Sequence, residues 1–300
     1  MKRRQVLMAA ALAGGMAHGL PSLAAAPRQR RVGHTGITWG YGADKAPQAI
    51  ADAGKLGYQG FESFGSVLEH WDARGGLQAA LHKARLPLIG AYLPLVLTDP
   101  LKRAEELDRA LRWGELIKQY GGTVAVIGPD NVDRRKFVFA DAERAIVTAL
   151  TYIGSALHDI GITAALHQHT GSCVMTRDEL YSVMDKVGAD QLKLCPDTGE
   201  LLAAGVDPLQ TVKDLLPRIA HVHLKDYDNG GDHDGYCPVG TGRVDMPAIL
   251  DVLETATQPF MLMAELNPAS ETALTHDKRS AGELAGISRQ HLAAWGYRFG

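Results

Sequence analysis

The stretch from Ile219 to Asp226 (Ile-Ala-His-Val-His-Leu-Lys-Asp) decides the fold class, because it has the pattern of a short β-strand with polar groups at every second position. His221, His223 and Lys225 share one face of this strand, and the residues between them are apolar. A strand buried on both sides normally has two apolar faces. Imidazoles and an amine on such a face are costly unless they meet water, a metal or a substrate. The stretch therefore predicts a strand that carries a functional site.

Matching polar residues occur at regular intervals along the rest of the chain. Asp197 lies 26 residues before His223, His167 lies 30 residues before Asp197, and Glu265 lies 42 residues after His223. One strand with its following helix takes roughly 30 residues. We therefore expect these four side chains at the ends of four successive strands.

Hydrophobic patterning over the whole chain predicts eight strand–helix pairs. The strands are expected at 32–39, 57–62, 86–92, 123–127, 162–167, 191–196, 219–226 and 260–265, and the helices at 44–56, 77–85, 99–120, 141–160, 176–187, 208–216, 246–253 and 278–295. The third helix is expected to start at Asp99-Pro100 and to share one face among Leu101, Ala104, Leu107 and Leu111. Strand–helix alternation predicts a parallel sheet, and eight units predict closure into an α/β (β/α)8 TIM barrel over residues 27–300 as a single domain. In such barrels the site lies at the carboxyl ends of the strands.

The first 26 residues have the pattern of an export signal. A basic start (Lys2 to Arg4) precedes a short apolar run and small residues that end at Ala26. Arg3-Arg4 partly matches a twin-arginine signal, so ordinary secretion stays open beside it. The alternative is an N-terminal membrane anchor, but glycines, a histidine and a proline interrupt the apolar run. We expect a periplasmic or secreted protein without membrane contact after removal of the leader, since no later segment reaches the roughly 18 apolar residues of a membrane span.

Charge and cysteine content exclude some functional classes. The 300-residue chain has a net charge of −3, and removing the leader, which holds three cations and no acids, moves the charge to −6. Nucleic acid is therefore not an expected partner, because phosphates require a basic surface. The three cysteines lack metal-finger spacing. One pair could bridge in an oxidising compartment, but a disulfide scaffold is not indicated.

The imidazole and carboxylate groups at the expected strand ends form a ligand set for one divalent metal ion, such as Mn, Zn, Co, Fe or Mg. These candidate metal ligands are His167, Asp197, His223 and Glu265. The alternative is that each is a separate polar residue that caps a strand end and bonds to loop backbone. Their repeat spacing favours a shared metal site at the barrel mouth.

Other polar residues near these ends allow more than one role. His169 has the parity of His167 and is expected to support a ligand, contact substrate, carry a proton, or stabilise a loop. Lys225 is expected to bind an oxyanion or donate a proton, or else to extend into solvent at the rim. Glu62, across the barrel from the cluster, suits a substrate-hydroxyl acceptor or an ion pair at the mouth. His221 is expected to be buried and hydrogen-bonded, and residues 228–234 to form a flexible loop over the site.

At these residues the sequence resembles the xylose-isomerase-like barrels, the sugar phosphate isomerase/epimerase superfamily, over residues 32–298. The motifs that carry the resemblance are Gly60-Phe61-Glu62, Asp197-Thr198-Gly199, His221 to Asp226, Gly240 to Asp245 and Ala264-Glu265. The run His167-Gln168-His169-Thr170-Gly171 is most similar to the inosose dehydratase branch.

The resemblance implies a divalent metal held by the last four strands and a ketose, inosose or related polyol as substrate. Asp197, His223 and Glu265 match the family's ligands. His167 stands where many epimerases have a glutamate, which puts symmetrical epimerisation in doubt and favours elimination or one-face isomerisation. Glu200 stands where the family commonly has histidine, so the substrate pocket is altered; Glu200 and Arg243 are expected substrate contacts.

The resulting functional hypothesis is a metal-dependent sugar isomerase or epimerase that removes a proton beside a carbonyl. The metal acts as a Lewis acid, Glu265 or a histidine is the expected base, and His169 or Lys225 the expected proton donor. The alternatives are an inosose-dehydratase-like enzyme, a lyase acting on keto-glycosides, and a non-catalytic periplasmic sugar-binding protein. The sequence leaves the oligomeric state open.

Overall fold

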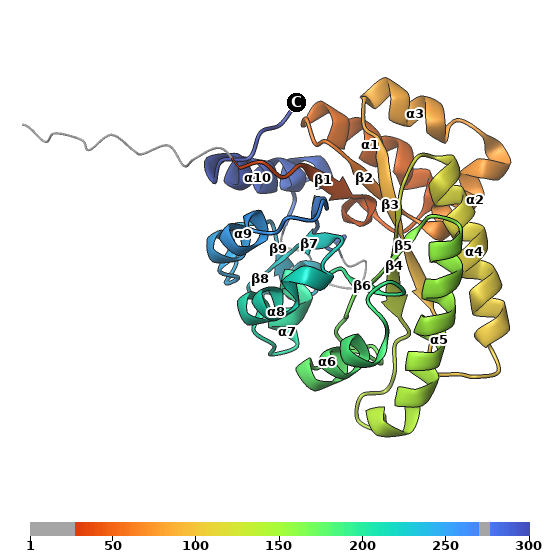
Figure 1. The fold of residues 1–300 in the computed structure, drawn as a ribbon. Helices are drawn as coiled ribbons and strands as arrows, with labels where there is room; N and C mark the ends of the chain where they lie inside the picture. The colour runs from red at the N-terminus through yellow and green to blue at the C-terminus, as the bar shows by residue number, and fades with distance from the viewer. Residues whose placement is uncertain (1–27, 270–276) are drawn as a thin grey trace, which may run out of the picture.

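The computed structural model describes residues 28–269 and 277–300, and in these ranges eight parallel strands form a barrel (Figure 1). Their order around the barrel is β6-β5-β4-β3-β2-β1-β10-β7. Parallel bridges from Leu194 to Ile219 and from Asp197 to His223 join the first strand to the last and close the barrel. The strands are β1 (Val32–Thr35), β2 (Phe61–Phe64), β3 (Leu88–Leu95), β4 (Val124–Pro129), β5 (Thr163–Leu166), β6 (Lys193–Leu194), β7 (Val222–Leu224) and β10 (Leu262–Ala264). The predicted TIM barrel is confirmed.

Helices cover the outside of the barrel (Figure 1). They are α1 (Ala46–Lys55), α2 (Gly65–Arg74), α3 (Leu77–Ala84), α4 (Arg103–Gln119), α5 (Phe139–Asp159), α6 (Arg177–Lys186), α7 (Thr198–Ala203), α8 (Pro208–Leu215), α9 (Met246–Glu254) and α10 (Ala281–Ala294). The sequence analysis identified eight of these helices and missed α2 and α7. Both begin within four residues of the preceding strand, so no turn signal separates them from it.

Two different packing environments surround the sheet. The outer face of the sheet is covered by the helices. Large buried aliphatic side chains of the helices, such as Leu68 on α2, Ile117 on α4 and Ile153 on α5, belong to this core. Inside the barrel, a small apolar cluster of Val124, Val126, Ala165 and Cys195 packs with Tyr92. Inward-facing side chains of a barrel fill its interior in layers. Buried polar residues, among them His167, Asp197, His223 and Glu265, occupy the interior at the carboxyl ends of the strands.

The face predicted for α4 is wrong. Leu101 is 93% exposed, because the regular helix begins at Arg103 and the preceding residues form a turn. The residues that pack inward are instead Ala110, Trp113 and Ile117. Their spacing of three and four is the expected helical pattern, one step out of phase with the predicted face.

The segment after β7 contains two short strands that the sequence analysis did not predict; residues 228–232 between them have no regular structure, and the predicted flexibility of this loop stays a prediction. Strands β8 (Asp226–Tyr227) and β9 (Tyr236–Cys237) pair antiparallel, and a 3-10 turn at His233–Gly235 lies between them. The carboxylate of Asp226 accepts hydrogen bonds from the backbone amides of residues 240, 242 and 244, which ties this segment to the chain that follows it. All three cysteines are free thiols and buried.

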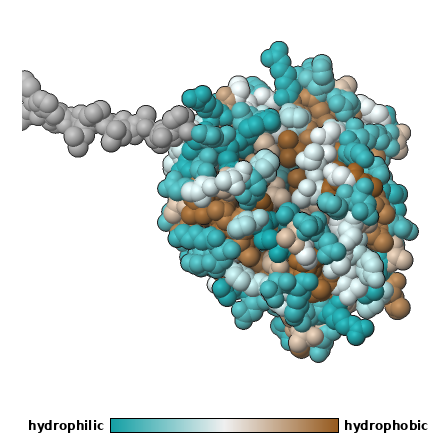
Figure 2. All heavy atoms as spheres, in the orientation of Figure 1, coloured by the Kyte–Doolittle hydropathy of each residue, from teal (hydrophilic) through white to brown (hydrophobic). Residues whose placement is uncertain are grey.

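Hydrophilic residues cover most of the face shown in Figure 2, with hydrophobic residues in small groups between them. Within residues 28–269 and 277–300, no helix is long and apolar enough to cross a membrane. The predicted export signal at residues 1–26 lies outside the described residues, and the export prediction remains a prediction.

Candidate active site

The four predicted metal ligands meet inside the barrel, at the ends of β5, β6, β7 and β10. His167, Asp197, His223 and Glu265 are at most 5% exposed, and each offers a ligand atom within 4.8 Å of the others'. His167 Nε2 lies 3.4 Å from Asp197 Oδ2, and His223 Nδ1 lies 3.1 Å from Glu265 Oε2 and 3.9 Å from Asp197 Oδ2. Two imidazole nitrogens and two carboxylates at this spacing suit a divalent cation.

The hydrogen bonding of His223 supports this fit. Its Nε2 donates to Glu62 Oε2 at 3.0 Å, whereas Nδ1 is buried and has no hydrogen-bond partner among the described residues. An imidazole that donates through one nitrogen presents its other nitrogen as the acceptor or metal ligand. Nδ1 is the nitrogen that faces Glu265 and Asp197, so the residues present fit a metal ion.

Glu62 does not lie apart from the cluster, as the sequence analysis expected, but contacts it from β2. Its Oε2 accepts hydrogen bonds from His221 Nε2 at 2.7 Å and from His223 Nε2 at 3.0 Å. Burial raises the pKa of the Glu62 carboxyl, but the two histidines outweigh burial and hold its pKa well below the ordinary value. Of the two roles considered for Glu62, the structure shows the ionic contact, and it confirms His221 as a buried hydrogen-bonded residue.

The two histidine ligands have opposite electrostatic environments. Burial lowers the pKa of His167, more than Asp197 raises it, so this imidazole is neutral as a metal ligand must be. Burial also lowers the pKa of His223, but Cys195, Glu62 and Glu265 raise it well above the ordinary value. A metal ion at this site would therefore take the place of a proton on His223.

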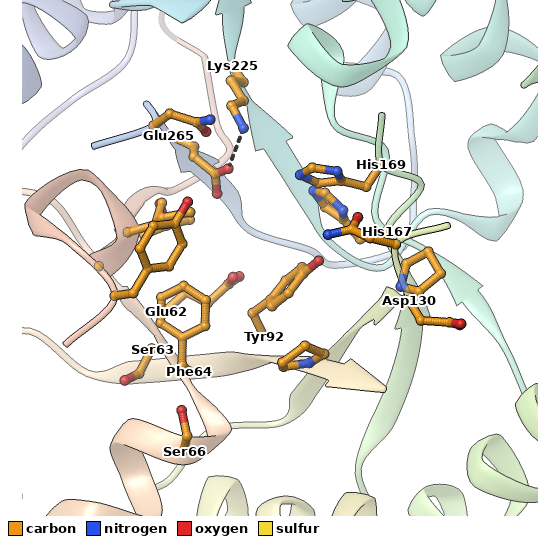
Figure 3. Close-up of a pocket in the computed structure, with 18 residues that line it drawn as sticks. Glu62, Ser63, Phe64, Ser66, Tyr92, Asp130, His167, His169, Lys225 and Glu265 are labelled. Carbon is orange, nitrogen blue, oxygen red and sulfur yellow. Dashed lines mark hydrogen bonds and ion pairs between the residues drawn. The ribbon is translucent and has the colours of Figure 1, made fainter. Parts of the chain in front are cut away.

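Lys225 does not extend to solvent, because its amine is buried between two carboxylates. Nζ lies 3.0 Å from Glu200 Oε1 and 3.1 Å from Glu265 Oε1, and 4.1 Å from the centre of the Tyr236 ring (Figure 3 draws the bond to Glu265). Burial lowers the pKa of this amine, but Glu200 and Glu265 raise it well above the ordinary value. Lys225 therefore keeps its proton and places a positive charge beside the metal cluster.

Glu200 supports its neighbours and does not face the cavity. Its Oε2 accepts hydrogen bonds from the amide and hydroxyl of Thr170, and its Oε1 faces both Lys225 and His169. Asp197 Oδ1 accepts a hydrogen bond from the Glu200 amide and so caps α7, whose first turn carries Glu200 inward. The structure thus shows contacts from Glu200 to other site residues, and Glu200 is not among the described residues that line the cavity beside the cluster.

His169 is the more accessible of the two neighbouring histidines. Its side chain is 34% exposed, with Nδ1 2.7 Å from the Thr170 carbonyl and Nε2 3.3 Å from Glu200 Oε1. Because a carbonyl only accepts, Nδ1 is the nitrogen that carries a hydrogen in the neutral ring. Nε2 is therefore the nitrogen able to exchange a proton.

A cavity of about 410 Å³ opens from this cluster to the surface. Its polar side is formed by Glu62, His167, His169, Lys225 and Glu265, and its other side includes aromatic rings and prolines (Figure 3). The sequence analysis did not identify the aromatic residues Tyr41, Phe64 and Tyr92, since aromatic residues at strand ends are usually core. Arg243 does not reach this cavity: it is exposed, with its guanidinium 5.5 Å from the centre of the Tyr227 ring.

Residues 50–289 match the model of the xylose isomerase-like TIM barrel family. The chain is 28% identical over 162 residues to the inosose dehydratase of Bacillus thuringiensis (strain Al Hakam), a match over 50% of this chain and 54% of that protein. The chain thus spans about half the length of the curated relatives it matches.

Solved structures agree with the fold at lower sequence identity. A sugar phosphate isomerase/epimerase from Parabacteroides distasonis has a TM-score of 0.71 at 15% identity and covers 92% of this chain and 98% of that one. The D-allulose 3-epimerase from Methylomonas sp., in complex with D-allulose, has a TM-score of 0.68 at 19% identity, over 90% and 98%. The IOLI protein with a bound zinc atom has a TM-score of 0.70 at 18% identity, over 89% and 98%.

The fold and the buried cluster define a parallel α/β barrel with a potential divalent-metal centre at the carboxyl ends of its strands. This chain belongs to the xylose isomerase-like TIM barrel family.

Proposed function

We propose that this protein is a metal-dependent enzyme that removes a proton beside the carbonyl of a ketose, an inosose or a related polyol. The observation that carries the proposal is the joint placement of a buried ligand set and a buried ammonium group, Lys225, on the floor of one cavity. His167, Asp197, His223 and Glu265 would hold the ion. When bound, a divalent metal supplies Lewis-acid polarisation of a substrate oxygen.

The protein's own residues divide the proton transfers among them. Glu265 is ionised, because His223 and Lys225 lower the pKa of its carboxyl more than burial raises it, and it faces the cavity as the base for the α-proton. Lys225 holds the negative charge that develops on the substrate as the proton leaves. His169, through Nε2, returns a proton at a different position of the same cavity.

Dehydration is the second candidate reaction, and one arrangement favours it. By the resemblance, His167 stands where many epimerases have a glutamate, so this cavity has an imidazole in place of a second carboxylate base. Glu265, with Lys225 3.1 Å away, can remove a proton, and the imidazole of His169 can protonate a departing hydroxyl. The 28% identity to inosose dehydratases over half the chain supports the same candidate.

The test is solvent-deuterium exchange with a panel of ketoses and inososes, using metal-loaded and chelator-treated protein. We expect deuterium at the α-carbon of at least one substrate with loaded protein only, and ultraviolet absorbance of an enone if water is eliminated. Glu265→Gln should abolish exchange, because an amide is not a competent base. His169→Gln should keep the metal and the α-carbon exchange but slow product formation, because the group that returns the proton is lost.

Two outcomes would contradict the proposal. The first is no exchange with any carbonyl compound in the panel, which would favour a non-catalytic sugar-binding protein. The second is exchange at the wild-type rate in Glu265→Gln with metal still bound, which would move the base to another residue, first to His169.

A further inference from the structure

Three aromatic rings follow one wall of the cavity from the protein surface to the metal cluster. The ring centroids of Tyr41 and Phe64 are 5.9 Å apart, those of Phe64 and Tyr92 are 5.8 Å apart, and those of Tyr92 and His167 are 5.4 Å apart. Tyr41 is 61% exposed at the outer end, whereas Tyr92 packs on a metal ligand at the inner end. From Tyr92, which contacts the proposed metal ligand His167, the aromatic wall therefore continues outward through Phe64 to Tyr41.

Charged and hydrogen-bonding side chains lie opposite this aromatic wall at the inner end of the cavity, beside the proposed metal site. Lys225, Glu265 and His169 lie across the inner part of the cavity, where Figure 3 shows Phe64 and Tyr92 on the opposite side. A sugar ring has the matching division, with C–H groups on its faces and hydroxyls at its edge. Aromatic faces carry partial negative charge and attract such C–H groups. One sugar ring against Tyr92 would place its hydroxyls at the metal cluster and leave Tyr41 without contact.

The charge of the lining indicates what kind of molecule reaches Tyr41. Among the described residues that line the cavity, Lys225 is the one lysine or arginine, and Glu200 and Glu265 compensate its charge. Glu62 and Asp130 are further carboxylates in the same lining. Outside the metal site, a phosphate or carboxylate on the substrate would find no uncompensated lysine or arginine in this lining, so the outer part of the cavity favours an uncharged ligand.

We propose that Tyr41 and Phe64 form a second binding subsite, which holds the aglycone or second ring of a neutral glycoside while its oxidised sugar ring occupies the metal site. This inference rests on the proposed function and narrows its substrate class from free sugars to glycosides. The subsite adds no catalytic group. It contributes stacking area at the mouth, where Tyr41 has most of its surface available.

The test compares the keto forms of methyl glucoside and phenyl glucoside, called below the two glucosides, in titrations of metal-loaded protein followed by ligand-observed NMR. We expect phenyl glucoside to bind roughly 2- to 12-fold more tightly to the wild type, the range that one aromatic stacking contact provides. Tyr41→Ala should reduce this ratio to about one, and Tyr41→Phe should keep it. Tyr152→Ala is the matched control, because Tyr152 is 56% exposed on α5 and does not line the cavity.

The outcomes distinguish a failure of the proposed subsite from a failure of the proposed function. Equal binding of both glucosides to the wild type, or an unchanged ratio in Tyr41→Ala, would overturn the subsite and leave the proposed function standing. Failure of both glucosides to bind would overturn the subsite as well, and the deuterium-exchange panel would then decide the proposed function independently. A ratio that falls equally in Tyr152→Ala would show that the preference arises elsewhere on the surface.

Discussion

Glu62→Gln is the substitution that most sharply separates metal positioning from metal ligation. One oxygen of Glu62 accepts from two buried imidazoles, at 2.7 Å from His221 and 3.0 Å from His223. An amide of the same shape can keep a carbonyl oxygen at the position of Glu62 Oε2, but it loses the negative charge that holds the two imidazole N–H groups. Carboxylates that orient a ligating histidine typically contribute 10- to 100-fold in metal affinity. We therefore expect metal affinity to fall by roughly 10- to 100-fold, although Glu62 is not one of the four proposed ligands.

The assay is a competition titration of metal-free protein against a chromophoric chelator, with thermal unfolding of the metal-free form measured in parallel. Glu179→Gln is the matched control: Glu179 is also a buried glutamate, but it bonds to Arg134 and to the amides before α6. The control should lose stability without losing metal affinity. Wild-type metal affinity in Glu62→Gln would refute the reasoning that Glu62 orients His223.

Three further predictions concern other parts of the chain. Lys225→Met leaves two buried carboxylates without their cation, so we expect chemical denaturation to show a loss of roughly 3–5 kcal/mol in unfolding free energy at pH 7; an unchanged value would contradict this. Burial lowers the pKa of His34 to about 4, and the unfolded chain binds a proton near pH 6.5. Stability therefore falls as pH drops from about 6.5 to 4, by roughly 3 kcal/mol from this group, and His34→Gln should flatten the curve over that window; parallel curves would contradict the assignment. For the leader, intact mass of protein from its native host should show a chain that starts between Ala25 and Pro27; retention of residues 1–26 would contradict export.

The fold was predictable because strand and helix patterns repeat along the chain, whereas details at the strand ends were not. The pattern of β7 and the spacing of Asp197, His223 and Glu265 predicted the closed barrel and the convergence of these residues. The inward face of α4 was misassigned, because Pro100 marks a turn before the regular helix and not its first residue. Helix α7 was missed because Asp197, which caps its N-terminus, was assigned only to the metal cluster. In the structure Asp197 has both roles.

The roles of individual site residues depended on contacts between strands that are not neighbours in sequence. Glu62 on β2 meets His221 and His223 on β7, two strands beyond β1 in the sheet, because inward side chains cross the barrel interior. Sequence spacing alone cannot show which inward residues meet. The contact of Glu200 with Lys225 likewise depends on the direction of a helical turn, and the exposed position of Arg243 outside the cavity lining has no signal in the sequence.

The central claim is that one metal ion is held by side chains from four strands around an acid–base cavity, and stoichiometric metal titration tests it most directly. Metal-free wild-type protein should bind one equivalent of zinc or manganese per chain. Asp197→Ala and His223→Ala should bind none with high affinity, while circular dichroism shows that both variants remain folded. Full occupancy in both folded variants, or no high-affinity binding by the wild type, would contradict the claim.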